Sequence, residues 1–152
     1  MPPRALGPLL AAALAVLGCA REGPEKPLPP ACAAGPEAVL EALRAAPRPV
    51  RLHEGVPLSR CLARHSTGGD LQAVGASFVG AASTLADRAA HAPDGRAAAE
   101  LGYLVGAVER GARSPGGNTS GEMVRRVELE LDAVDHRSQA VRSGLRAGRV
   151  TG

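Results

Sequence analysis

The scarcity of aromatic side chains limits the kind of core that this chain can build. Phe78 and Tyr103 are the only aromatic residues among 152. A fully buried aromatic side chain removes about 150–250 Å² from water, so a core without such residues buries less apolar area per residue. The chain therefore needs close backbone packing or a covalent crosslink to be stable.

Helix-forming residues dominate the apolar content. Hydrophobic residues make up 45% of the chain, and alanine is the commonest of them. Alanine, leucine, arginine and glutamate favour helices, whereas the β-branched and aromatic residues that favour strands are scarce. The composition predicts an all-α fold, and the length predicts one small domain.

The charge balance argues against a nucleic-acid partner. The chain has 18 basic and 15 acidic residues, for a net charge of +3. Nucleic-acid-binding domains carry a concentrated basic surface, and recognition of single strands uses stacked aromatic rings. We therefore expect no nucleic-acid partner.

The first 18 residues have the pattern of an export signal. A short basic start, residues 1–4, precedes an apolar run over 5–17. That run is too short to span a bilayer, which takes roughly 20 residues, but it fits the core of a signal peptide. The chain is therefore expected to be exported.

The end of this run carries the motif Val16-Leu17-Gly18-Cys19. It resembles the lipobox of bacterial lipoproteins, although Leu17 is bulkier than the usual residue. The resemblance covers only this motif and the run before it. It implies cleavage after Gly18, attachment of a diacylglyceryl group to Cys19 and a lipid anchor made of palmitate-like chains. An ordinary secretory signal followed by a coincidental cysteine is the alternative.

A proline-rich stretch follows Cys19. Residues 20–34 contain four prolines among charged residues and show no apolar period, which is typical of an extended tether. We expect a signal peptide over 1–18, a lipidated cysteine and tether over 19–35, and a helical domain over 36–152. The expected location is the extracytoplasmic face of a bacterial cell membrane, to which two or more acyl chains bind firmly.

Two cysteines remain if Cys19 is lipidated. Cys32 and Cys61 form an even pair in an oxidising compartment, which predicts a disulfide. A redox site is disfavoured because C-x-x-C is absent, and a zinc site because histidines and cysteines are not clustered at ligand spacing. No metal or cofactor is expected.

Proline, capping residues and apolar spacing outline the N-terminal helices. A short helix is expected to begin at Pro36, and a second short segment at Pro57. Thr67 and Asp70 have capping-box spacing and predict a long helix that ends near His91.

A further helix is expected after Asp94, which is placed to cap its start. In that helix Gly102 and Gly106 lie one turn apart, which lets a neighbouring backbone approach closely. Charged neighbours and a short apolar run exclude a membrane-spanning role for this pair.

The C-terminal region predicts one long helix. Apolar residues recur there at steps of three and four, with one polar interruption at Ser138, and Thr119 with Glu122 gives a capping box at the start. The expected architecture is a small antiparallel bundle of three main helices with two short N-terminal ones.

No catalytic motif was found. The four histidines are scattered. The pairing of His53 with Glu54, or of His65 with a nearby serine, lacks a nucleophile motif or metal site beside it. We therefore expect a protein that is not an enzyme, with no catalytic residues.

The leading hypothesis is a membrane-anchored helical module that binds another envelope protein. Its expected interaction face is the apolar stripe of the C-terminal helix: Val127, Leu131, Val134, Val141 and Leu145. The alternative is a carrier of a small apolar ligand or lipid. A third hypothesis, an envelope hydrolase, requires His53 and His65 to converge on a carboxylate.

Overall fold

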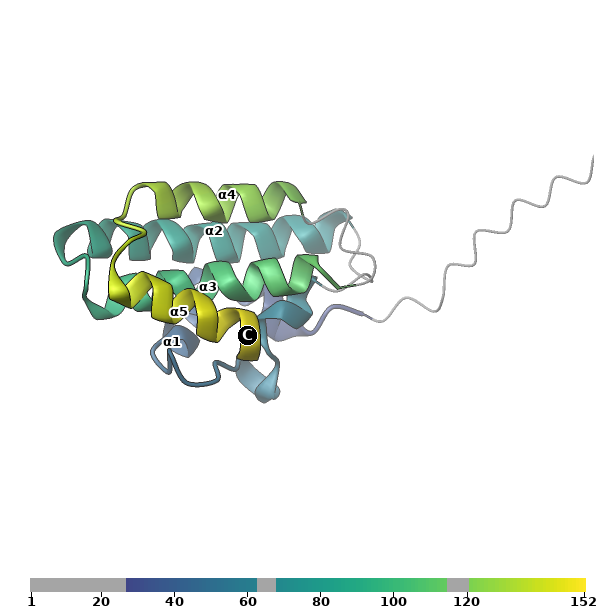
Figure 1. Ribbon diagram of the computed structural model, residues 1–152. Helices are drawn as coiled ribbons and strands as arrows, with labels where there is room; N and C mark the ends of the chain where they lie inside the picture. Colours follow the sequence, from purple (N-terminus) through teal and green to yellow (C-terminus); the bar gives the residue numbers. More distant parts are fainter. Residues whose placement is uncertain (1–26, 63–67, 115–120) are drawn as a thin grey trace, which may run out of the picture.

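A computed structural model of the full chain describes residues 27–62, 68–114 and 121–152 (Figure 1). The expected signal peptide and the lipid site at Cys19 lie outside these residues. Within the described residues, no helix combines the length and the apolar character that crossing a bilayer requires.

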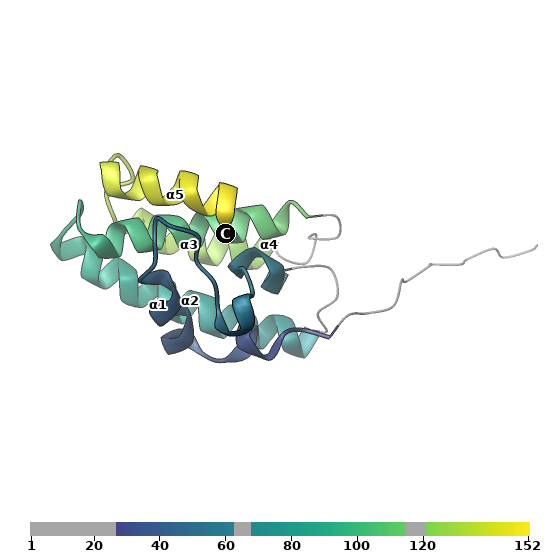
Figure 2. The same ribbon diagram turned by 90° about the horizontal axis from the view of Figure 1, so that it is seen from below.

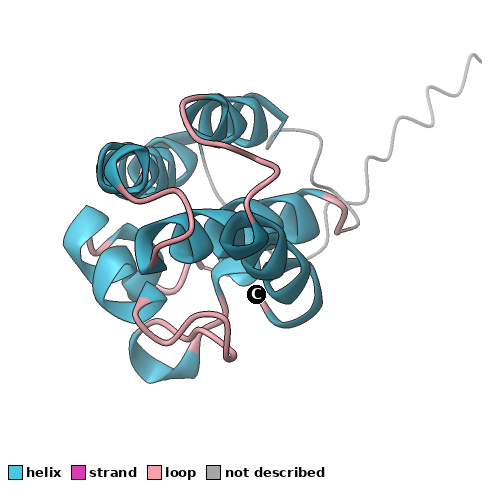
Figure 3. Cartoon of the chain, turned by 60° about the vertical axis from the view of Figure 1, so that its left-hand side comes forward, coloured by secondary structure: helices cyan, strands magenta, loops and turns pink. Residues whose placement is uncertain are grey.

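The described residues contain helices and loops but no strand, as Figure 3 shows, so the predicted all-α fold is confirmed. The capping residues Thr67 and Thr119 and the histidine His65 lie outside the described residues. The α-helices are α1 (Pro36–Leu43), α2 (Gly68–His91), α3 (Arg96–Ala112), α4 (Gly121–Asp132) and α5 (Gln139–Thr151). Three 3₁₀ turns accompany them: η1 (Pro30–Ala33), η2 (His53–Gly55) and η3 (Leu58–Leu62).

Helix α3 forms the centre of the bundle. It packs against α2, α4, α5 and η3, and Figures 1 and 2 show these elements around it. Every residue from 100 to 108 is buried, so this middle part of the helix is enclosed on all sides. Because these residues face other elements of the fold on every side, apolar and small residues are favoured along this stretch.

The C-terminal region is two helices rather than the single one expected. Helix α4 ends at Asp132, and α5 begins at Gln139. The hydroxyl of Ser138 accepts a hydrogen bond from the backbone N–H of Val141 at 3.1 Å, so this serine caps α5 instead of interrupting a heptad seam. The helix breaks here because short polar side chains compete with helical hydrogen bonds and favour caps.

Asp94 caps a different helix from the one expected. The N-cap of α3 is Gly95, which makes no side-chain cap. Asp94 Oδ1 instead accepts a hydrogen bond from the backbone N–H of Gln139 at 3.1 Å. The turn between α2 and α3 therefore holds the first residue of α5, a contact across 45 residues of sequence that local spacing cannot reveal.

The folded domain begins before residue 36, where the tether was expected to end. Ala31 and Cys32 are buried in η1, and Leu28 packs against the core. Cys32 and Cys61 form the predicted disulfide, with a Cα–Cα distance of 5.4 Å. The disulfide joins η1 to η3, so the last residues of the proline-rich stretch belong to the fold.

Candidate functional site

The predicted interaction face lies in the core, so this prediction was wrong for the folded domain. Val127, Val134 and Val141 are buried, and Leu131 and Leu145 are partly buried against the same cluster. These side chains are used internally because α4 packs on α2 and α3 while α5 packs on α3. A binding surface must be sought elsewhere.

The close approach expected at Gly102 and Gly106 is confirmed, and the partner is α5. A Cβ on either glycine would lie within 3.0 Å of a backbone oxygen of α5, on Val141 or Leu145. The contacts advance in the same direction along both helices, so α3 and α5 are parallel. A parallel pair of this kind differs from the antiparallel arrangement expected for the main helices.

Three further glycines on α5 and at its end were not recognised as packing residues in the sequence. Gly144, Gly148 and Gly152 recur every four residues, and a Cβ on any of them would lie within 3.0 Å of α3 atoms. Their spacing was a usable signal. It was obscured because Val141 and Leu145 were assigned to an apolar seam.

The end of α5 is tied to the N-terminal part of the domain through Tyr103. The buried Tyr103 hydroxyl accepts a hydrogen bond from the backbone N–H of Val50 at 3.0 Å and lies 2.9 Å from Thr151 Oγ1. Arg51 also donates to the carbonyl of Thr151, at 2.8 Å. Ser59 donates to the carbonyl of Gly152 at 2.6 Å. The only tyrosine thus joins three segments of the fold.

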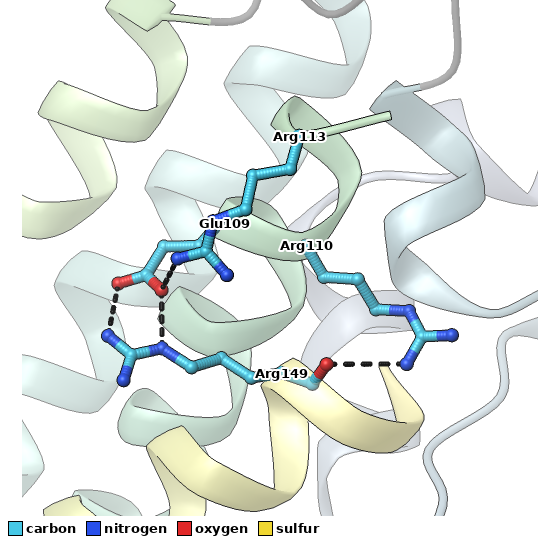
Figure 4. A network of polar contacts seen from close by, with 4 residues as sticks. All are labelled: Glu109, Arg110, Arg113 and Arg149. Atoms are coloured by element: carbon cyan, nitrogen blue, oxygen red, sulfur yellow. Dashed lines mark hydrogen bonds and ion pairs between the residues drawn. The ribbon is translucent and has the colours of Figure 1, made fainter. Parts of the chain in front are cut away.

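An ion-pair network closes the same end of the α3–α5 pair (Figure 4). Glu109 accepts from Arg149 at 2.5 and 2.9 Å and from Arg113 at 2.9 Å. The hydrogen bond to Glu109 raises the pKa of Arg149 above its ordinary value. Arg110 donates to the carbonyls of Arg149 and Val150. These contacts cap the C-terminus of α5, and they give this end a structural role.

An open groove of about 560 Å³ lies between α2 and α4. Apolar and small side chains form much of its lining, and Met123 of α4 lies opposite Gly75 of α2. A Cβ on Gly75 would make only an ordinary 3.7 Å contact with the Met123 methyl group. The lining residues are Leu71, Gln72, Gly75, Ala76, Val79, Gly80, Glu122, Met123 and Arg126.

The charged rim of this groove belongs to α4. Glu122 accepts hydrogen bonds from Arg125 at 2.8 and 2.9 Å and from Arg126 at 2.8 Å. These bonds lower the pKa of Glu122 to about 2. The carboxylate therefore stays ionised at every pH at which the protein is expected to work, and the rim carries fixed charges of both signs.

A smaller cleft, of about 180 Å³, lies where α1, α2 and α3 meet. Glu100 of α3 lines it, and its side chain is only 8% exposed. Arg96 Nε lies 3.5 Å from Glu100 Oε1, yet Oε1 has no hydrogen-bond donor among the described residues. Burial raises the pKa of Glu100, while the charges of Arg96, Arg88 and Arg44 oppose the rise.

Replacing Glu100 by glutamine is expected to stabilise the protein near neutral pH. Because its pKa is higher in the folded than in the unfolded chain, the folded chain binds more protons, and stability falls as pH rises above the ordinary value of 4.5. The charged groups around the carboxylate are Glu37 and Glu41 of α1, Arg44 directly after α1, Arg88 of α2 and Arg96 of α3.

Urea unfolding at about pH 3.5 and about pH 7 measures this effect, since the glutamine variant lacks the titration. The variant should be more stable than the wild type at the higher pH, and the gap should shrink at the lower one. A variant that is less stable at neutral pH would mean that the ionised carboxylate contributes to folding.

The histidines do not assemble a site in the described residues. His53 is exposed on η2, whereas His65, with which it was expected to converge in a hydrolase, lies outside the described residues. His91 Nδ1 lies 2.8 Å from the carbonyl of Asp87, and His136 Nδ1 lies 3.1 Å from that of Leu131. In the described part of the chain, no three His, Cys, Asp or Glu side chains are grouped to hold a metal ion.

Comparison with known proteins identified no relative. The chain matched no protein-family model, no curated protein and no solved structure.

Proposed function

We propose that this protein is an exported lipoprotein whose helical domain binds another protein of the bacterial envelope through the groove between α2 and α4. The observation that carries the proposal is the Gly75–Met123 region of this groove. Gly75 has room for a side chain that the fold does not use. A glycine in a helix interior lowers stability by roughly 0.5–1 kcal/mol relative to alanine. Because no contact within the fold requires a glycine at position 75, we infer that a contact with a partner does.

The dimensions of the groove suit a short helix. Its α2 lining extends from Leu71 to Gly80, which is about 14 Å, or two to three helical turns. Gly75 and Ala76 allow a backbone to come close, and Met123 has a flexible side chain that adapts to a partner's shape. The mixed charges of Glu122 and Arg126 at the rim fit the polar edge of an amphipathic helix.

The carrier hypothesis is less well supported. A carrier encloses its apolar ligand, and small-molecule sites bury most of the ligand surface. The groove lies open at the surface between two helices, and charged Glu122 and Arg126 line it. An amphipathic helix matches both its apolar and its charged lining, whereas an acyl chain matches only the former.

The anchor is tested by the intact mass of the protein isolated from its native membrane. We expect a mature chain that begins at Cys19, carries a diacylglyceryl group and partitions with membranes, because two or more acyl chains bind a bilayer firmly. A Cys19→Ser variant should lack the lipid mass. A wild-type mass without lipid, in the soluble fraction, would support the ordinary secretory signal instead.

The groove is tested by filling it. Gly75→Leu places a side chain in the space opposite Met123 and should reduce partner binding by about tenfold or more, since the clash costs over 1.4 kcal/mol. A photo-crosslinker at Gln72, which lines the groove, reports binding in intact envelopes. The crosslinked peptide, identified by mass spectrometry, should be an amphipathic helical segment of one protein.

Gly75→Ala is the matched control. It adds only the Cβ for which the structure has room, so it should fold like the wild type and reduce crosslinking less than Gly75→Leu does. A crosslinker at the exposed Arg146 of α5 should give no such product. Equal crosslinking in Gly75→Leu would contradict the groove as the binding site, and crosslinks to acyl chains would favour the carrier.

A further inference from the structure

The cleft at Glu100 has an acceptor that the described residues leave without a donor. The Glu100 side chain is 8% exposed and lines the cleft, and no group in the described part of the chain donates a hydrogen bond to Oε1. Buried polar groups nearly always have a partner, and a buried acceptor that lacks one costs stability. A ligand with N–H donors would satisfy this oxygen.

The arginines around the cleft differ in how far they are already engaged. Arg44 pairs with Glu41 at 2.9 Å, and Arg96 contacts Glu100 at 3.5 Å and the carbonyl of Arg44 at 3.4 Å. Arg88 also lines the cleft and is exposed, and within the described residues it has no ion pair. The cleft thus combines a buried, unsatisfied carboxylate oxygen with an accessible guanidinium.

We propose that this cleft binds a small zwitterion, with an ammonium group donating to Glu100 Oε1 and an anionic group accepting from Arg88. The six charged side chains of the lining, three arginines and three glutamates, have no net charge, so a ligand with no net charge balances them best. The volume, about 180 Å³, is below the usual range for drug-sized ligands and suits a small molecule. Amino acids and glycerophosphoethanolamine, whose phosphodiester carries a single negative charge, both have this chemistry.

The cleft is separate from the groove between α2 and α4. Arg88 lies near the C-terminal end of α2, whereas the α2 residues of the groove lie in its N-terminal half. This site is independent of the proposed partner groove, and neither requires the other.

The test is isothermal titration calorimetry of the purified full-length protein with glycerophosphoethanolamine and with L-alanine. We expect binding of at least one of them, with a dissociation constant in the micromolar to low millimolar range. Glu100→Gln and Arg88→Gln should each weaken it by about tenfold or more, since both remove a charged hydrogen-bond partner. Arg146→Gln, outside the cleft, should bind like the wild type.

Analogues that lack either the N–H donors or the anionic group test the two ends of the ligand one at a time. Glycerophosphocholine lacks N–H donors, and ethanolamine lacks the anion, so both should bind more weakly than glycerophosphoethanolamine. Vesicles with and without phosphatidylethanolamine distinguish a headgroup from a solute. Binding to such vesicles without binding of either free zwitterion would assign the same chemistry to a lipid.

Three results would overturn the proposal: no binding of either zwitterion or of the vesicles, equal binding by Glu100→Gln, or equal binding of glycerophosphocholine. Circular dichroism melting of each variant shows whether it is folded, so a loss of binding is not mistaken for a loss of structure.

Discussion

Replacing Gly148 by alanine should destabilise the protein by on the order of 3 kcal/mol, a large effect for one methyl group. A Cβ at this position would lie within 3.0 Å of the carbonyl of Tyr103 and of the backbone N–H of Ala107. These are backbone atoms of the central helix, so no side chain can rotate away. The clash can be relieved only by separating α5 from α3, which also disturbs the contact of Thr151 with Tyr103.

Thermal unfolding followed by circular dichroism measures this effect, and we expect the midpoint to fall by roughly 10 °C or more. Gly75→Ala is the matched control, because its Cβ would meet only the Met123 methyl group at 3.7 Å. It should stabilise the protein by about 0.5–1 kcal/mol, since alanine is a better helix former than glycine. If Gly148→Ala destabilises the protein and Gly75→Ala stabilises it, the loss at Gly148 comes from the packing clash and not from helix propensity. A neutral Gly148→Ala would mean that α3 and α5 are farther apart than described.

The glycine contacts illustrate how far a sequence predicts packing. The spacing of Gly102 and Gly106 correctly indicated a close backbone approach, because four residues are one helical turn and small residues leave space there. It did not identify the partner helix. That partner has the same four-residue spacing at Gly144 and Gly148, so the signal was present on both sides, but pairing depends on tertiary contacts.

The C-terminal helices were misjudged because apolar periodicity was given more weight than local capping. Steps of three and four continue through Ser138, yet this residue and Asp135 each accept a bond from a nearby backbone N–H. Such bonds end one helix and start another at little cost. The break turns α5 back alongside α3 and places Val127, Val134 and Val141 in the core, where none is available to a partner.

Neither the groove nor the cleft was predictable from local sequence. The groove depends on how α4 lies against α2, and the cleft brings together residues from α1, α2 and α3. A glutamate in a helix is ordinarily exposed, so the residue type of Glu100 does not indicate burial. Glu100 is buried because α3 lies at the centre of the bundle. The spacing of residues along α3 does not predict that position.

Removing the disulfide should destabilise the protein by about 3–4 kcal/mol. Cys32 and Cys61 are separated by 29 residues, and a crosslink that closes such a loop restricts the unfolded chain by about this amount in the chain-entropy model. The double variant Cys32→Ala/Cys61→Ala leaves no free thiol at either position. Urea unfolding should show a lower midpoint for the variant than for the oxidised wild type.

Reduction provides the control. A thiol reductant should lower the unfolding midpoint of the wild type toward that of the double variant and leave the variant itself unchanged. A difference below about 1 kcal/mol would contradict a stabilising role, since even the low end of the usual range is larger. Domains of this size are typically stable by only 5–15 kcal/mol, and this core contains one phenylalanine and one tyrosine. The crosslink is thus expected to supply a sizeable fraction of the stability that aromatic side chains provide elsewhere.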